Sequence, residues 1–198
     1  MGPGGASEER MHSREEAISL WREHNSDDSQ YRHALSVEAA MRHFAKKYGE
    51  DPEYWGIVGL LHDIDYGEYP KEHLEHARPI LAAAGYPEAF IRAVESHGWG
   101  ICSEIEPVHV MEKVLFACDE LTGFIAACAY VRPSKSVLDL EVKSVKKKWG
   151  TAAFAAGVNR QVIEKGAGLL GMPLEELIQE TILALRANAE ELGLKGNL

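Results

Sequence analysis

Apolar residues recur along most of the chain at spacings of three and four, and no stretch alternates strictly between apolar and polar positions. This period is typical of amphipathic helices, so the pattern predicts an all-α protein. Residues 13–16, Ser-Arg-Glu-Glu, have the order of a capping box and predict the start of a first helix. A second helix is expected over residues 28–48, because Gly49 follows its last periodic position.

Proline and glycine signals around the remaining periodic segments predict further helices. They are expected over residues 53–64, 71–84, 87–97, 107–131, 158–170 and 173–192. Arg132-Pro133-Ser134 breaks the pattern, and a lysine-rich segment follows it. We therefore expect a flexible lead at residues 1–12, a helical domain at 13–131, and a C-terminal helical extension at 132–198 packed on the same core.

Composition narrows the classes of function. With 198 residues, 45% of them hydrophobic, the chain is long enough to bury a core. Its 21 basic and 31 acidic residues leave a net charge of -10, which argues against binding to duplex nucleic acid or an anionic membrane. Three cysteines without a CxxC pair favour reduced thiols and a cytoplasmic location. We expect no signal peptide and no membrane span. A homodimer is compatible with the sequence, which does not define an oligomeric state.

The pair His62-Asp63 closes an apolar run and is the first candidate for chemistry. A carboxylate at the end of a buried segment needs a cation or a hydrogen-bond network to compensate its desolvation. His33 lies on the inward line of the second helix, and Asp119 falls within about 40° of Leu115 on the apolar stripe of the long helix. Taken alone, His33 is more simply a core histidine, whereas Asp119 on an apolar stripe needs a partner, and a salt bridge to an Arg or Lys is the alternative to a metal ion. Together the four residues predict a metal site.

This H...HD...D order resembles the HD superfamily of metal-dependent phosphohydrolases over roughly residues 30–130. Further matching phrases are Gly-Leu-Leu-His-Asp-Ile-Asp at 59–65, Ala-Val-Glu-Ser-His at 93–97 and Ala-Cys-Asp-Glu-Leu-Thr-Gly at 117–123. The resemblance implies that one divalent ion (Fe, Mn, Zn or Mg) is held by His33, His62, Asp63 and Asp119. It further implies that His73 and His97 hold a second ion, with Asp63 bridging the two. His76 competes with His73 for this place.

The resemblance also implies an activity, the hydrolysis of a small phosphate monoester or diester, with nucleotides among the candidates, by a metal-activated water. Asp63 and Asp65 are assigned to catalysis, and Asp65 is expected to orient or deprotonate the water. Many relatives carry Gly-Lys just after the HD pair, whereas this chain has Asp65-Tyr66-Gly67. If only one ion binds, His97 is the alternative to Asp65.

Arg132 and Lys135 follow the helix that carries Asp119, and they are expected to bind the phosphate group of the substrate. A solvated face paired with nearby acids is the alternative for this basic segment. Two other functions remain open. One is a di-iron oxygenase of the same fold, which metal identity would separate from a hydrolase. The other is a non-catalytic domain that binds a nucleotide or a partner protein, which the intact set of four residues disfavours.

Overall fold

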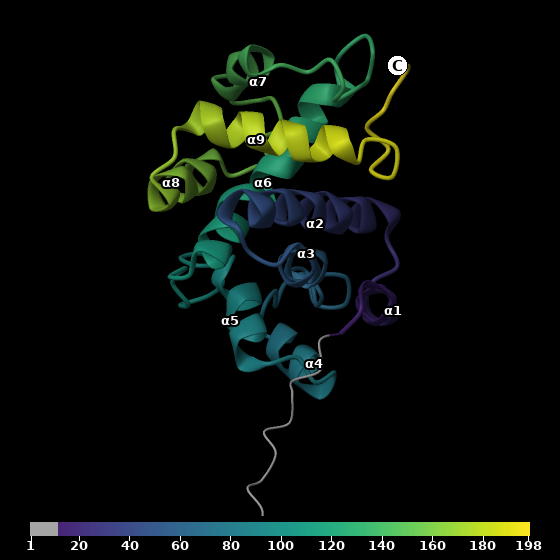
Figure 1. Cartoon of the computed structure of the whole chain (residues 1–198), viewed down its shortest axis with the longest axis vertical. Coiled ribbons are helices and arrows are strands. Elements are labelled where there is room, and N and C mark those ends of the chain that lie inside the picture. The colour runs from purple at the N-terminus through teal and green to yellow at the C-terminus, as the bar shows by residue number, and fades with distance from the viewer. Residues whose placement is uncertain (1–11) are drawn as a thin grey trace, which may run out of the picture.

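A computed structural model describes residues 12–198 of the chain. The predicted flexible lead at residues 1–12 therefore lies outside the described residues except for its last position. Between residues 12 and 198 the chain forms nine α-helices and no β-strand (Figure 1). The predicted all-α class is confirmed.

The helices match the expected order, with one addition. They are α1 (Arg14–His24), α2 (Asp28–Tyr48), α3 (Pro52–Leu61), α4 (Ala77–Ala83), α5 (Glu88–Ser96), α6 (Val110–Tyr130), α7 (Val142–Trp149), α8 (Arg160–Leu170) and α9 (Leu174–Ala187). The predicted capping box begins α1, because the Ser13 side chain accepts from the Glu16 N–H while Glu16 accepts from the Ser13 N–H. Gly49 ends α2 in the left-handed conformation, with φ of 71°.

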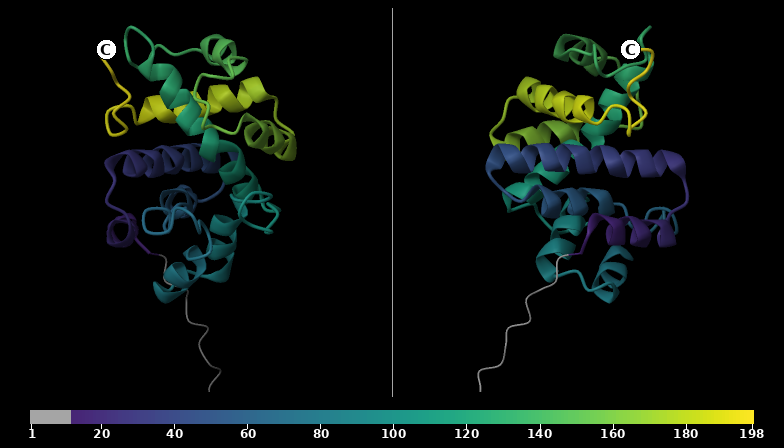
Figure 2. Two further views of the ribbon diagram at one scale, coloured as in Figure 1. Left: turned by 180° about the vertical axis from the view of Figure 1, so that it is seen from behind. Right: turned by 45° about the vertical axis from the view of Figure 1, so that its right-hand side comes forward.

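Helix α2 crosses the middle of the molecule and packs against α3, α6 and α9 (Figure 1). The views in Figure 2 place α1, α3, α4 and α5 on one side of α2 and α7, α8 and α9 on the other. Helix α6 runs past α2 and packs against α5 on the first side and α8 on the second. Buried residues from both sides, including Trp21, Leu61, Phe124, Ile163 and Leu185, belong to one apolar cluster. The domain boundary expected at residue 131 stays a prediction.

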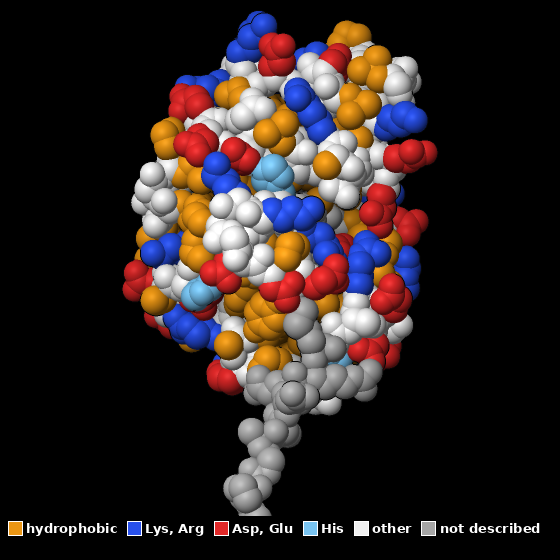
Figure 3. All heavy atoms as spheres, viewed as in Figure 1, with side chains coloured by type: hydrophobic (Ala, Val, Ile, Leu, Met, Phe, Trp, Pro, Cys, Tyr) orange, Lys and Arg blue, Asp and Glu red, His pale blue; other side chains and the backbone are white. Residues whose placement is uncertain are grey.

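Two features of the described residues concern how the molecule could meet other surfaces. None of the described helices combines the length and apolar character that crossing a bilayer requires. On the face in Figure 3, acidic and basic side chains are interspersed among apolar ones.

Two predicted helix boundaries near the HD pair are wrong. Helix α3 ends at Leu61 rather than at residue 64, and α4 begins at Ala77 rather than at residue 71. The segment between them folds around the buried carboxylate of Asp65, which accepts hydrogen bonds from His73 Nδ1 and from the backbone N–H of His76. Because these bonds compete with a regular helix, residues 71–76 form turns instead.

Other differences lie farther from the HD pair. Helix α6 begins at Val110, after His109 and Glu112 form a capping box, rather than at residue 107. Helix α7 was not predicted, although Val142, Val145 and Trp149 have helical spacing. The last two helices are shorter than predicted, since α8 begins at Arg160 and α9 spans only Leu174–Ala187.

Candidate metal centre

Six side chains from five segments of the chain converge near the middle of the molecule. They are His33 on α2, His62 and Asp63 just after α3, His73 in the following turns, His97 at the end of α5, and Asp119 in the middle of α6. In sequence they span almost ninety positions. They are brought together because α3 and α6 pack against α2, and α5 packs against α3 and α6.

The first cluster joins His33, His62, Asp63 and Asp119, whose ligand atoms all lie within 4.8 Å of one another. Asp119 Oδ1 lies 2.9 Å from His33 Nε2 and 3.1 Å from His62 Nε2. Asp63 Oδ2 lies 3.2 Å from His62 Nε2 and 3.6 Å from His33 Nε2. Two imidazole nitrogens and two carboxylates therefore face one point, as a site for a divalent ion requires.

The second cluster joins Asp63, His73 and His97. Asp63 Oδ1 lies 3.2 Å from His73 Nε2 and 3.3 Å from His97 Nε2, and the two Nε2 atoms are 3.1 Å apart. Asp63 thus offers one oxygen to each cluster. This carboxylate has the position of a bridge between two ions.

Hydrogen bonds on the far side of the rings show that the donors fit metal ions. The Nδ1 atoms of His62 and His97 lie 2.7 and 2.6 Å from the backbone carbonyls of Gly59 and Val94. A carbonyl oxygen can only accept, so each Nδ1 carries a proton, and once the ring is neutral its Nε2 presents a lone pair to the cluster. His73 has the same arrangement, with Nδ1 donating to Asp65. Such outer contacts orient histidine ligands in metal sites.

The facing rings of His73 and His97 give a specific reason why a cation fits the second cluster. With both Nδ1 atoms donating outward, the two Nε2 atoms face each other at 3.1 Å as acceptors when both rings are neutral. Two lone pairs at this distance repel, and a cation between them removes the conflict. A proton can serve the same purpose, so protons and metal ions compete for these nitrogens.

Charge in the two clusters shifts the ionisation of their members. Burial alone would lower the pKa of His73, but its bonds to Asp63 and Asp65 outweigh burial and raise that pKa to about 9. Burial would likewise raise the pKa of Asp119, yet His62 and His33 hold it well below its usual range. Both carboxylates of the first cluster are therefore anionic and ready to bind a cation at neutral pH.

A cavity of about 380 Å³ opens onto both clusters. Its other walls include the apolar side chains of Ile101, Val158 and Val162, the phenol ring of Tyr66, and the carboxylate of Glu120. No lysine or arginine is among the described residues that line it. Bound cations would therefore have to provide the positive charge for an anionic substrate.

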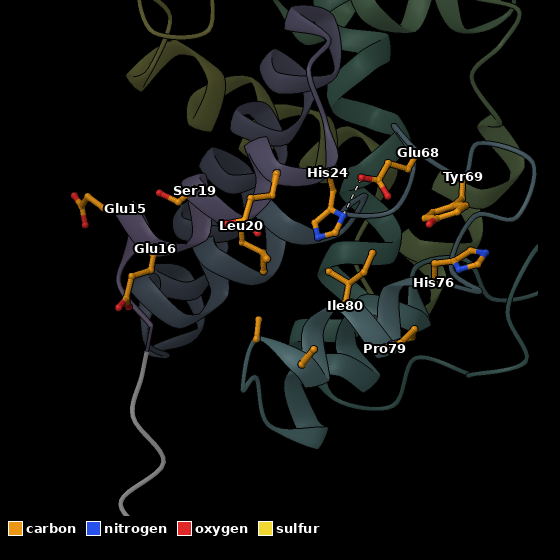
Figure 4. A pocket seen from close by; sticks show the side chains of 13 residues that line it. Glu15, Glu16, Ser19, Leu20, His24, Glu68, Tyr69, His76, Pro79 and Ile80 are labelled. Carbon is orange, nitrogen blue, oxygen red and sulfur yellow. Dashed lines mark hydrogen bonds and ion pairs between the residues drawn. The ribbon is translucent and has the colours of Figure 1, made fainter.

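A larger cavity, of about 880 Å³, lies between α1 and α4 and contains none of the six clustered side chains (Figure 4). His76 lies in its wall, stacked on Tyr69 with ring centroids 3.7 Å apart and bonded to Glu72. The competition between His73 and His76 is thereby decided, because only His73 reaches the clusters. The volume of a cavity therefore does not identify the metal centre in this protein.

Three expected site residues occupy other places. Asp65 is fully buried and holds His73, so it does not face the cavity in which a water would react. Arg132 pairs with Asp139 at 3.0 Å, and neither Arg132 nor Lys135 lines the cavity. The physical reason is distance along the helix, because Arg132 lies thirteen residues beyond Asp119, or about 20 Å at 1.5 Å per residue.

Several cavity residues were not anticipated from the sequence. Glu120 and Gly123 follow Asp119 on α6. Gly123 lies four positions after Asp119, and this spacing places Asp119 and Gly123 on one face of the helix. That spacing is a signal the sequence does contain. Val158 and Val162 come from the C-terminal region, and no local pattern connects them with the metal ligands.

Comparison with known proteins agrees with this geometry. Residues 31–122 match the family model of the HD domain, a range that contains all six clustered side chains. No curated protein and no solved structure matches the chain. The family match and the two clusters therefore fall in the same segment of the chain, which is similar to the HD domain over residues 31–122.

Proposed function

We propose that this protein is a metal-dependent phosphohydrolase that acts on small phosphate esters, nucleotides among them. The observation that carries the proposal is the position of Asp63, with one oxygen in each of two ligand clusters at the floor of one cavity. Such paired sites clamp a phosphoryl group between two ions.

When bound there, divalent ions would neutralise phosphoryl oxygens and lower the pKa of a water molecule. The protein's own groups prepare the site for them. The carbonyls of Gly59 and Val94 and the carboxylate of Asp65 hold three imidazole rings with Nε2 facing inward. Because these rings are fixed before binding, little reorganisation is required.

The walls of the cavity favour a substrate with a modest negative charge. Asp63, Asp119 and Glu120 are the carboxylates that line it, and no cationic side chain is present among its described lining residues. Two divalent ions against three carboxylates leave a small positive excess. A single phosphoryl group suits this balance better than a triphosphate at the same point.

Metal reconstitution tests the proposal. Protein stripped with a chelator would be reloaded separately with manganese, iron, zinc or magnesium, and metal content would be measured alongside phosphate release from mono- and diesters. We expect hydrolysis with at least one loaded metal, lost in Asp119→Asn and retained in Arg132→Gln, whose side chain lies outside the cavity. Stoichiometric metal without hydrolysis of any ester would reject the hydrolase and favour a binding domain.

A di-iron oxygenase is the second candidate, because the same six ligands suit two iron ions. Iron-loaded protein would then consume oxygen with its substrate, and manganese would not replace iron. Hydrolysis that continues without oxygen and with manganese excludes this alternative for the tested substrate.

A further inference from the structure

The cavity over the two clusters, here called the metal lobe, adjoins a second cavity. The second one, the distal lobe, also measures about 380 Å³ and lies between α2 and α6. Both lobes are lined by Ser29, His33 and Gly123. These shared residues place the junction of the lobes directly beside a metal ligand.

Gly123 keeps this junction open. It lies in the interior of α6, where glycine is less favourable than alanine. Helix packing does not require a glycine here, because a Cβ atom at residue 123 would meet nothing within 4 Å. At Gly166, by contrast, the same atom would lie 2.5 Å from Ala117 Cα. The space beside Gly123 therefore belongs to the cleft, and a larger side chain there would occupy it.

The two lobes differ in charge. Glu120 and the two ligand carboxylates line the metal lobe, whose described residues include no arginine or lysine. Arg32 lines the distal lobe, where no acidic residue occurs among the described lining residues. Its side chain is exposed, and it forms no ion pair or side-chain hydrogen bond with any residue between 12 and 198. Arg32 is thus available to an anionic group of a ligand.

We propose that the substrate is an extended phosphate ester that passes Gly123, with its phosphoryl group in the metal lobe and a second anionic group bound by Arg32 in the distal lobe. This inference rests on the proposed function for the identity of the first group. In this arrangement Gly123 admits a substrate long enough to reach both lobes, and Arg32 favours a substrate with a negative charge at its far end. Neither residue acts in the chemical step.

Equilibrium binding tests this inference without turnover. The probes are methylphosphonate, long alkyl monophosphonates, and alkanes of the same length with a phosphonate at each end, titrated calorimetrically into manganese-loaded protein. We expect the two-ended probe to bind about ten-fold more tightly than its one-ended match, equivalent to about 1.4 kcal/mol. Arg32→Gln should remove this difference. Gly123→Val should weaken both long probes at least about ten-fold more than it weakens methylphosphonate.

Matched controls separate local from general effects. Gly168→Val alters a helical glycine whose surroundings are also open but which lines neither lobe, and Arg132→Gln removes a guanidinium outside both. Both controls should bind every probe as the original protein does. The inference is overturned if the original protein binds the two long probes equally, or if Arg32→Gln still binds the two-ended probe more tightly than the one-ended probe. It is also overturned if no phosphonate binds. Tight two-ended binding without hydrolysis of any ester contradicts only the proposed function.

Discussion

The buried carboxylate of Asp65 accepts a hydrogen bond from Nδ1 of His73 at 2.9 Å, and the opposite nitrogen of that ring lies 3.2 Å from Asp63. The second oxygen of Asp65 accepts from the backbone N–H of His76. One side chain thereby holds both a metal-cluster ring and the turn that carries it. The second residue after the HD pair thus supports the second cluster from outside the cavity.

Replacing Asp65 by asparagine should weaken the second metal site and leave the first intact. The amide can still accept from one of the two donors, but its NH₂ group then faces the other donor. Loss of such an outer contact typically costs about 10- to 100-fold in metal affinity. Titration of chelator-stripped protein with manganese or zinc would measure both sites, with Glu72→Gln, beside His76, as the control. Equal weakening of the two sites would contradict this role.

Proteins with Asp63→Ala and with His97→Ala should differ in how many metal ions they retain. Asp63→Ala removes an oxygen from both clusters, whereas His97→Ala removes a nitrogen from the second cluster only. We therefore expect the first substitution to weaken both sites and the second to leave one ion per chain. Elemental analysis after gel filtration provides the measurement. One ion retained with full affinity in Asp63→Ala would exclude a bridging position.

The metal-free protein should lose stability as pH rises through about 9, the pKa of folded His73. A histidine in an unfolded chain has a pKa of about 6.5, so the stabilising contribution is complete below that pH and disappears above the folded value. The size is on the order of 1–3 kcal/mol. Thermal unfolding in chelator from pH 6 to 10 should show this decline.

His73→Gln is the control for that decline, because its side chain does not titrate in this range. A melting temperature that falls equally in both proteins would assign the effect to another group. Metal-loaded protein should behave in the opposite way, since binding requires neutral imidazole and strengthens as protons leave.

Two glycines of α8 should respond differently to alanine. A Cβ at Gly166 would lie 2.6 Å from Ala117 Cβ on α6, so Gly166→Ala should destabilise the fold by about 1–3 kcal/mol. Gly168 has open space around the same atom, and its replacement should be neutral or stabilise by about 0.5–1 kcal/mol. Urea unfolding measures both. A similar response at the two positions would contradict the close approach of α8 to α6.

Much of the helical architecture was predictable because helix signals are local. The capping box at Ser13, the left-handed end at Gly49 and the proline at the start of α3 act within a few residues of one another, and all three occur as expected. The predictions failed where a distant or buried partner replaced local bonding. Residues 71–76 left the helical pattern because Asp65 bonds to His73 and His76.

For the site, the sequence by itself determined the residue types and their order, because a His-Asp pair beside a buried run and an acid on an apolar stripe both need a partner. It could not determine which side chains line one cavity. Only the tertiary structure placed Asp63 between two clusters, turned Asp65 toward His73, separated Arg132 from the cleft and brought Val162 into it. These relationships depend on how helices cross in three dimensions, which spacing along one helix does not specify.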